Sequence, residues 1–108
     1  MNGKGKEYDE LGLLEFDGEY LNGKRNGKGK EYYYELRLYL IFKGEYINGK
    51  RKGKGKEYYE NGRLKFEGEY FNGERNGKGK EYNEDGKLLL EGQYFHGERK
   101  YIIKKYLK

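Results

Sequence analysis

One sequence motif occurs three times in the chain. The pattern Phe-x-Gly-Glu-Tyr-x-Asn-Gly-x-Arg-x-Gly-Lys-Gly-Lys-Glu-Tyr occupies residues 16–32, 42–58 and 66–82. Incomplete copies stand at residues 2–8 and 90–99. A fixed period is typical of a structural unit stacked on copies of itself, in which each unit contacts only its neighbours. We therefore expect an array rather than a fold around one central core.

The composition is compatible with a folded chain only because of its aromatic residues. Hydrophobic residues make up 33% of the sequence and charged residues 40%, which is typical of disorder. Against this, the 14 Tyr and 5 Phe recur at fixed positions, and there is no proline. Tyrosine buries ring area while its hydroxyl stays in water. We predict a thin folded object with a small core in each repeat.

Each repeat has the pattern of a β-hairpin. Residues 64–70 alternate apolar or small residues with charged ones, which indicates a half-buried strand. Asn-Gly follows, and this dipeptide between alternating runs is a strong hairpin signal because both residues tolerate positive φ. No helix signal is present. The predicted fold is all-β: an elongated, twisted antiparallel meander of stacked hairpins, one for each interval of 24 to 26 residues.

Glycines and charges indicate how the hairpins pack. A strand position without a side chain leaves room for a ring from a neighbouring position, so we expect the rings to lie over glycines and form a continuous spine. Glu19, Glu45 and Glu69 lie on the first strands, whereas lysines fill the returning strands. Antiparallel pairing would then set acids against bases and help to fix the register.

The glycine and aromatic positions resemble the MORN (membrane occupation and recognition nexus) repeat. Its pattern, aromatic-x-Gly-x-aromatic-x-x-Gly-x-x-x-Gly-x-Gly, is met in all three full copies. The copy that begins at Leu90 loses the final glycine pair to Tyr101 and Ile103. The resemblance implies an array without catalysis of its own. Family members act as scaffolds, dimerisation modules, protein or peptide binders and modules beneath membranes, and phosphoinositide binding has been proposed for some.

These patterns divide the chain into an array over residues 1–100, with a partial, three full and one partial repeat, and a basic cap or tail over 101–108. The half unit at the N-terminus leaves an edge that is open to a second copy or to a missing segment of a longer protein. No apolar stretch has the length of a signal peptide or a membrane span. We expect a cytoplasmic protein, with membrane association as the alternative.

Catalytic, cofactor and metal sites are not predicted. The chain has no Ser, Thr or Cys, so the usual hydroxyl and thiol nucleophiles are missing. Its one histidine, His96, stands where other copies have the Asn of the turn. The carboxylates repeat against lysines, which indicates a solvated ladder. Nucleic acid is disfavoured as a partner because the same acids would repel phosphates.

Two functions are left open. The first is a non-enzymatic scaffold that presents an aromatic-lined face to a protein or peptide partner, or to a second copy. Aromatic anchors often dominate interface energy. The candidate anchors are Tyr20, Tyr46, Tyr70, Tyr94, Phe71 and Phe95. The same rings could instead form the core of the sheet, and the sequence leaves both roles open. The alternative is a peripheral module that binds anionic phospholipids. Its candidates are basic residues of the turns and tail: Lys24, Arg25, Lys50, Arg51, Lys52, Lys104 and Lys105.

Overall fold

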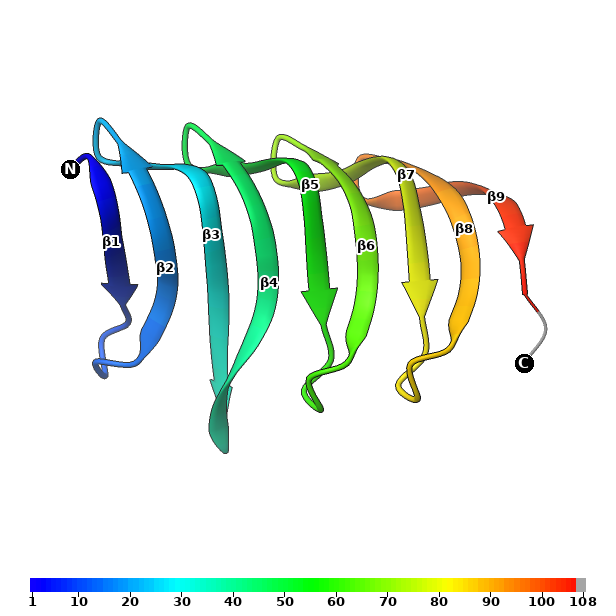
Figure 1. The fold of residues 1–108 in the computed structure, drawn as a ribbon, viewed down its shortest axis with the longest axis horizontal. Helices are drawn as coiled ribbons and strands as arrows, with labels where there is room; N and C mark the ends of the chain where they lie inside the picture. Colours follow the sequence, from blue (N-terminus) through cyan, green and yellow to red (C-terminus); the bar gives the residue numbers. More distant parts are fainter. Residues whose placement is uncertain (107–108) are drawn as a thin grey trace.

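The computed structural model describes residues 1–106, which form nine strands in one antiparallel sheet (Figure 1). The strands lie in the order of the sequence, so each pairs only with its neighbours along the chain. They are β1 (Gly3–Tyr8), β2 (Leu14–Leu21), β3 (Lys24–Glu35), β4 (Arg37–Ile47), β5 (Lys50–Tyr58), β6 (Leu64–Phe71), β7 (Glu74–Tyr82), β8 (Leu88–Phe95) and β9 (Glu98–Lys105). The predicted all-β meander of hairpins is confirmed.

The predicted Asn-Gly turns all lie at the same ends of the strands, and we call this side of the sheet the Asn-Gly edge. Asn72 and Gly73 have φ of 54° and 90°, the two positive values of a type I′ turn, which matches the twist of paired strands. Asn22 and Asn48 repeat this geometry. His96 also adopts it, with φ of 52°, so its place as a turn residue is confirmed. The amide of Gly73 donates to the carbonyl of Arg51, which ties this turn to the preceding hairpin.

The opposite edge holds wider turns and one longer hairpin. The side-chain oxygen of Asn83 accepts hydrogen bonds from the backbone amides of Asp85 and Lys87 at 2.9 and 3.0 Å. The asparagine side chain thereby stabilises the turn between β7 and β8. β3 and β4 instead continue past this level, and Figure 1 shows their tip projecting beyond the neighbouring turns. Leu36 forms the tip with φ of 67°. The longer interval between the first two copies thus becomes a longer hairpin.

A bulge bends each returning strand. Between β2 and β3 the register shifts opposite Gly27, whose φ is 101°. The carboxylate of Glu19 accepts a hydrogen bond from the amide of Lys28 at 2.7 Å and so satisfies the backbone at the shift. Gly53 and Gly77 have equivalent conformations. Because an extra residue bends its strand, β3, β5 and β7 cross sideways before they turn downward (Figure 1).

β9 continues the sheet across the boundary that the sequence analysis placed after residue 100. Tyr101 pairs with Gln93, and Lys105 pairs with Leu90. Residues 101–105 are therefore strand, and their role as a cap stays a prediction. Leu107 and Lys108, which belong to the predicted cap or tail, lie outside the described residues. No helix that could cross a membrane occurs between residues 1 and 106.

Candidate functional site: the two faces of the sheet

One face of the sheet carries an aromatic spine over glycines. The ring of Phe42 lies against Gly44 and Gly55, where any Cβ would collide with it. Each phenylalanine ring meets its own tyrosine and the tyrosine of the next hairpin edge to face, with Phe42 and Tyr70 at 5.1 Å between centroids. Edge-to-face contact is the favoured geometry of aromatic pairs. The buried spine comprises Tyr20, Phe16, Tyr46, Phe42, Tyr70, Phe66 and Tyr94. The predicted packing of rings over glycines is confirmed.

An arginine covers the outer side of each phenylalanine ring. The guanidinium carbons of Arg25, Arg51 and Arg75 lie 4.2, 3.9 and 4.0 Å from the ring centroids of their own repeats. Such contact combines packing with attraction between the cation and the π electrons. Each ring is therefore enclosed between glycine backbone and a guanidinium, which explains why Phe42 has no exposed surface.

A glutamate from the preceding hairpin fixes each arginine. Glu31 accepts two hydrogen bonds from Arg51, at 2.9 and 3.0 Å, and a third from the hydroxyl of Tyr46. Parallel bonds of this kind are the strong form of an Arg–carboxylate pair. Glu57 holds Arg75 and Tyr70 in the same way. The network links successive hairpins, and it was missed from the sequence although Glu and Arg keep fixed places in every copy.

The ionisation of these groups follows from the same contacts. Burial by itself raises the pKa of Glu31, but hydrogen bonds from Arg51 and Tyr46 outweigh it and hold that pKa below the ordinary value. Burial, together with the Glu31 hydrogen bond, raises the pKa of Tyr46. In the first repeat, burial and Glu7 raise the pKa of Tyr20 to about 12. The network is thus an ionised, structural one at neutral pH.

Four of the six predicted partner residues lie in this spine. Tyr20, Tyr46, Tyr70 and Tyr94 are buried. Phe71 and Phe95 are about half exposed and lie elsewhere, next to the Asn-Gly turns. The structure therefore does not bring the six together, and a partner can reach only the two phenylalanines without displacing the spine. Their role as anchors stays a prediction.

The opposite face carries a groove of about 940 Å³ that runs across the strands. Side chains alternate along a strand, so the residues on either side of each spine glycine point to this face. The groove is lined by glycines from β2 to β8 and by rows of charged residues, from Lys4 and Asp17 at one end to Glu91 at the other, where Ile103 also lines it. A Cβ built on these glycines would point toward the face that carries the spine, so only glycine backbone lines the floor of the groove.

The charges of the groove pair largely as predicted. Lys28 stands opposite Glu45, and Lys54 stands opposite Glu69. In the row on the other side of the glycines, acids and lysines also alternate from strand to strand, with one exception. Lys43 has a lysine on each side, since it pairs with Lys30 and with Lys56.

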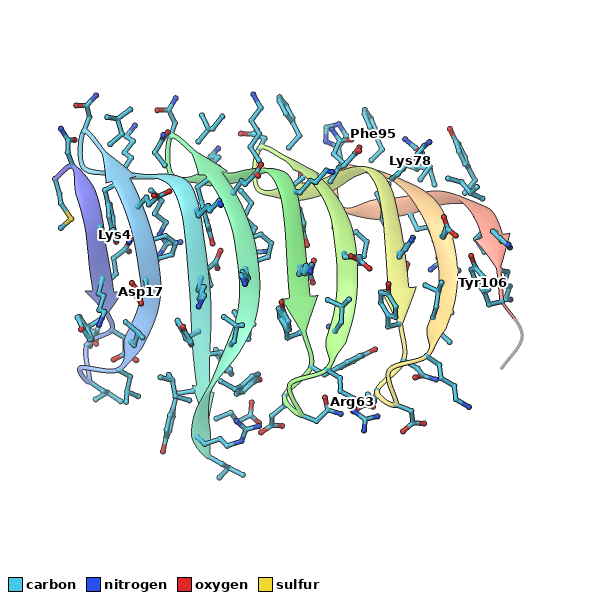
Figure 2. All side chains as sticks on the ribbon, in the orientation of Figure 1. Lys4, Asp17, Arg63, Lys78, Phe95 and Tyr106 are labelled. Carbon is cyan, nitrogen blue, oxygen red and sulfur yellow. The ribbon has the colours of Figure 1, made fainter. Side chains whose placement is uncertain are left out.

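A row of exposed apolar side chains follows the groove face along the Asn-Gly edge. It consists of one residue per hairpin, placed directly before the turn: Leu21, Ile47, Phe71 and Phe95. Figure 2 shows Phe95 at this edge and Arg63 at the opposite one. Only the two phenylalanines are recognisable as candidates from the sequence, because Leu and Ile at these positions look like ordinary strand residues. We call these four residues the apolar row.

The predicted lipid-binding residues fall into two groups. Arg25 and Arg51 are held by glutamates over the spine rings. The lysines, by contrast, are exposed: Lys24, Lys50 and Lys52 lie near the Asn-Gly edge, and Lys104 and Lys105 lie on β9. The structure thus brings three of the seven residues together at one edge. The lipid role of all seven stays a prediction.

His96 has the surroundings of a surface turn residue. Its Nδ1 lies 3.6 Å from a carboxylate oxygen of Glu74, and both side chains are largely exposed. Within residues 1–106, no three acidic or histidine side chains lie close enough together to hold a metal ion.

Comparison with known proteins places the chain in a family. Stacked hairpins in an open sheet, with a glycine and aromatic spine on one face and a groove on the other, define a β-repeat array of the binding or scaffolding kind. The MORN repeat model matches residues 16–35, 42–62 and 66–87, more than half of the chain. The chain therefore belongs to the MORN repeat family, whose modules are typically non-enzymatic. A comparison with curated proteins found no match.

Proposed function

We propose that this chain is a non-enzymatic scaffold whose groove face binds a segment of a protein partner. One observation carries the proposal. The aromatic face is closed by its own arginines and glutamates, whereas the opposite face keeps a groove beside the apolar row. Exposed aromatic residues and a concave recess are both typical of binding surfaces. The anchors on this surface are Phe71 and Phe95, which are free to contact a partner without unfolding the sheet.

Affinity capture with matched variants tests this function. The immobilised protein is compared with a Phe71→Gln/Phe95→Gln double variant and with Leu11→Gln. Leu11 is the control because it is 84% exposed in the turn between β1 and β2, away from the apolar row. We expect a protein retained by the wild type and by Leu11→Gln but lost by the double variant. An identical set of captured proteins on all three would contradict the proposal.

A second candidate function is binding to an anionic membrane. The apolar row shares its edge with Lys24, Lys50 and Lys52, and apolar side chains beside lysines favour an anionic interface. Co-sedimentation with phosphatidylserine vesicles tests this function, with phosphatidylcholine vesicles as control. The protein should sediment with the anionic vesicles only, and salt should release it because screening weakens such contacts. Sedimentation that ignores salt and lipid charge would remove this candidate.

A further inference from the structure

Three adjacent lysines, Lys30, Lys43 and Lys56, interrupt the alternation of charges in one row of the groove. The row runs Lys6, Asp17, Lys30, Lys43, Lys56, Glu67, Lys80, Glu91 and Lys104 across the sheet. Acids and lysines alternate everywhere except at Lys43, which replaces the acid that Asp17, Glu67 and Glu91 supply in the other hairpins. Like charges directly opposite each other destabilise a sheet. The sequence thus keeps an unfavourable arrangement at one place.

The three lysines are accessible to solvent, and Lys43 has no acid opposite it on either neighbouring strand. Lys30, Lys43 and Lys56 are exposed, all three line the groove, and none forms an ion pair within the described residues. Adjacent strands are about 4.8 Å apart, so the three side chains start within about 10 Å of one another. Lys28 and Lys54 line the groove on the other side of the glycines. The one acid between Lys28 and Lys54 is Glu45, whose carboxylate accepts a hydrogen bond from the backbone amide of Lys54.

We infer that Lys30, Lys43 and Lys56 form an anion-binding subsite for acidic side chains of a protein segment that lies in the groove. This inference rests on the proposed function in placing such a segment there. A carboxylate above Lys43 would relieve the repulsion among the three lysines, since opposite charges across strands are favourable. The subsite thus adds a charge requirement to the apolar contacts of Phe71 and Phe95.

Charge complementarity favours a protein segment over a membrane at this position. Asp17 and Glu67 flank the three lysines in the row, and Glu45 lies inside the groove. A uniformly anionic surface would meet these acids together with the lysines and be repelled by them. A segment with acids at its centre and basic residues on both sides matches the order of charges in the row.

A peptide titration tests the subsite directly. The probe is a fluorescein-labelled peptide with three consecutive glutamates flanked by lysines, followed by anisotropy at low salt. The glutamine version of the peptide is the ligand control. Lys43→Gln is compared with Lys80→Gln, the matched control, because Lys80 lies in the same row between Glu67 and Glu91. We expect Lys43→Gln to weaken peptide binding about threefold and Lys80→Gln to leave it nearly unchanged.

A charge reversal separates binding from folding. Lys43→Glu restores the alternation, so we expect its thermal midpoint to rise by about 2 to 4 °C while peptide binding is lost. Equal effects of the two glutamine variants would overturn the inference, as would equal binding of the glutamine peptide. Tight binding of inorganic phosphate, or Lys43-dependent binding of phosphatidylserine vesicles without peptide binding, would also overturn it. Failure of the proposed function is a separate result, because it is measured with the Phe71 and Phe95 variants.

Discussion

The guanidinium of Arg51 lies 3.9 Å from the centre of the Phe42 ring and is hydrogen-bonded through two nitrogens to Glu31 of the preceding hairpin. Glu31 and Arg51 therefore tie together two neighbouring hairpins, which otherwise share backbone hydrogen bonds and ring contacts. The sheet formed by residues 1–106 is one layer thick, so no second layer of this part of the chain covers the rings. The arginine supplies that cover, and the glutamate keeps it in place.

Removal of this arginine should destabilise the array. Arg51→Ala uncovers Phe42 and leaves Glu31, whose side chain is 19% exposed, without its ion pair. We expect a loss of about 2 kcal/mol in the free energy of unfolding, measured with urea. Arg51→Lys keeps the charge but not the paired hydrogen bonds, so it should recover only part of the loss. A full recovery by lysine would show that charge alone matters.

Replacement of a spine glycine should be costly for steric reasons. A Cβ on Gly55 would lie 2.6 Å from a ring carbon of Phe42 and 2.9 Å from one of Tyr70. Overpacking of this kind costs about 3 kcal/mol, so Gly55→Ala should lower the denaturant midpoint strongly.

Gly49 provides the matched control for the spine glycine. It has φ of 87° but nothing within 4 Å of a built Cβ, so Gly49→Ala carries only backbone strain of about 1 kcal/mol. The ring contact would be the wrong explanation if the two variants lost equal stability.

Stability should fall at acid pH through the glutamates of the spine. Burial raises the pKa of Glu57, but hydrogen bonds from Arg75 and Tyr70 outweigh it, so its pKa lies below the ordinary value of 4.5. The folded state therefore binds this proton less readily than the unfolded state. The contribution of ionised Glu57 to the free energy of unfolding is therefore fully present above pH 4.5. It is lost as the pH falls through the lower pKa that Glu57 has in the folded state.

Urea unfolding between pH 7 and pH 3 measures this effect in the wild type and in Glu57→Gln. The variant should be less stable than the wild type at pH 7, and the difference should narrow below pH 4.5 as the carboxylate of the wild type takes up its proton. A difference that stays constant across this range would show that Glu57 stabilises the fold through something other than its charge.

The Asn-Gly turns permit a test on His96. Both Asn72 and His96 have φ above 50°, where residues other than glycine and asparagine are strained. We expect His96→Asn to stabilise the chain by about 0.5 kcal/mol and Asn72→Ala to destabilise it by about 1 kcal/mol. Thermal unfolding of the two variants measures both effects. A loss of stability in His96→Asn would indicate that the contact of the imidazole with Glu74 outweighs the turn preference.

The sequence determines the hairpins and the spine because both depend on local spacing. Alternation, Asn-Gly turns and glycines near aromatic rings act within one or two strands, so the sequence could predict rings packed over glycines, although not which ring covers which glycine. The lysine and glutamate register followed in the same way. The unequal intervals of 24 and 26 residues could also be counted from the sequence, although the longer β3–β4 hairpin that results from them could not be predicted.

Contacts between hairpins were harder to foresee. The sequence makes Arg51 a lipid-binding candidate, because a basic residue after a turn looks exposed and nothing local shows that Glu31, twenty residues earlier, holds it. The groove was missed as well. It arises where the backbones of many glycines line up across the sheet, and a periodic sequence does not show which face will be recessed.

The tip of the β3–β4 hairpin is the place where the chain departs most from its own repeat. Leu36 is 91% exposed and has φ of 67°, a conformation that costs a leucine about 1 kcal/mol and a glycine little. The exposed side chain has little packing to lose. We therefore expect Leu36→Gly to raise the free energy of unfolding by about 0.5 kcal/mol. The control is Leu36→Ala, which shortens the side chain but keeps the strain and should change stability little. If both variants are less stable than the wild type in urea, the leucine side chain must pack against the hairpin after all, and the tip is a structural element rather than a strained projection.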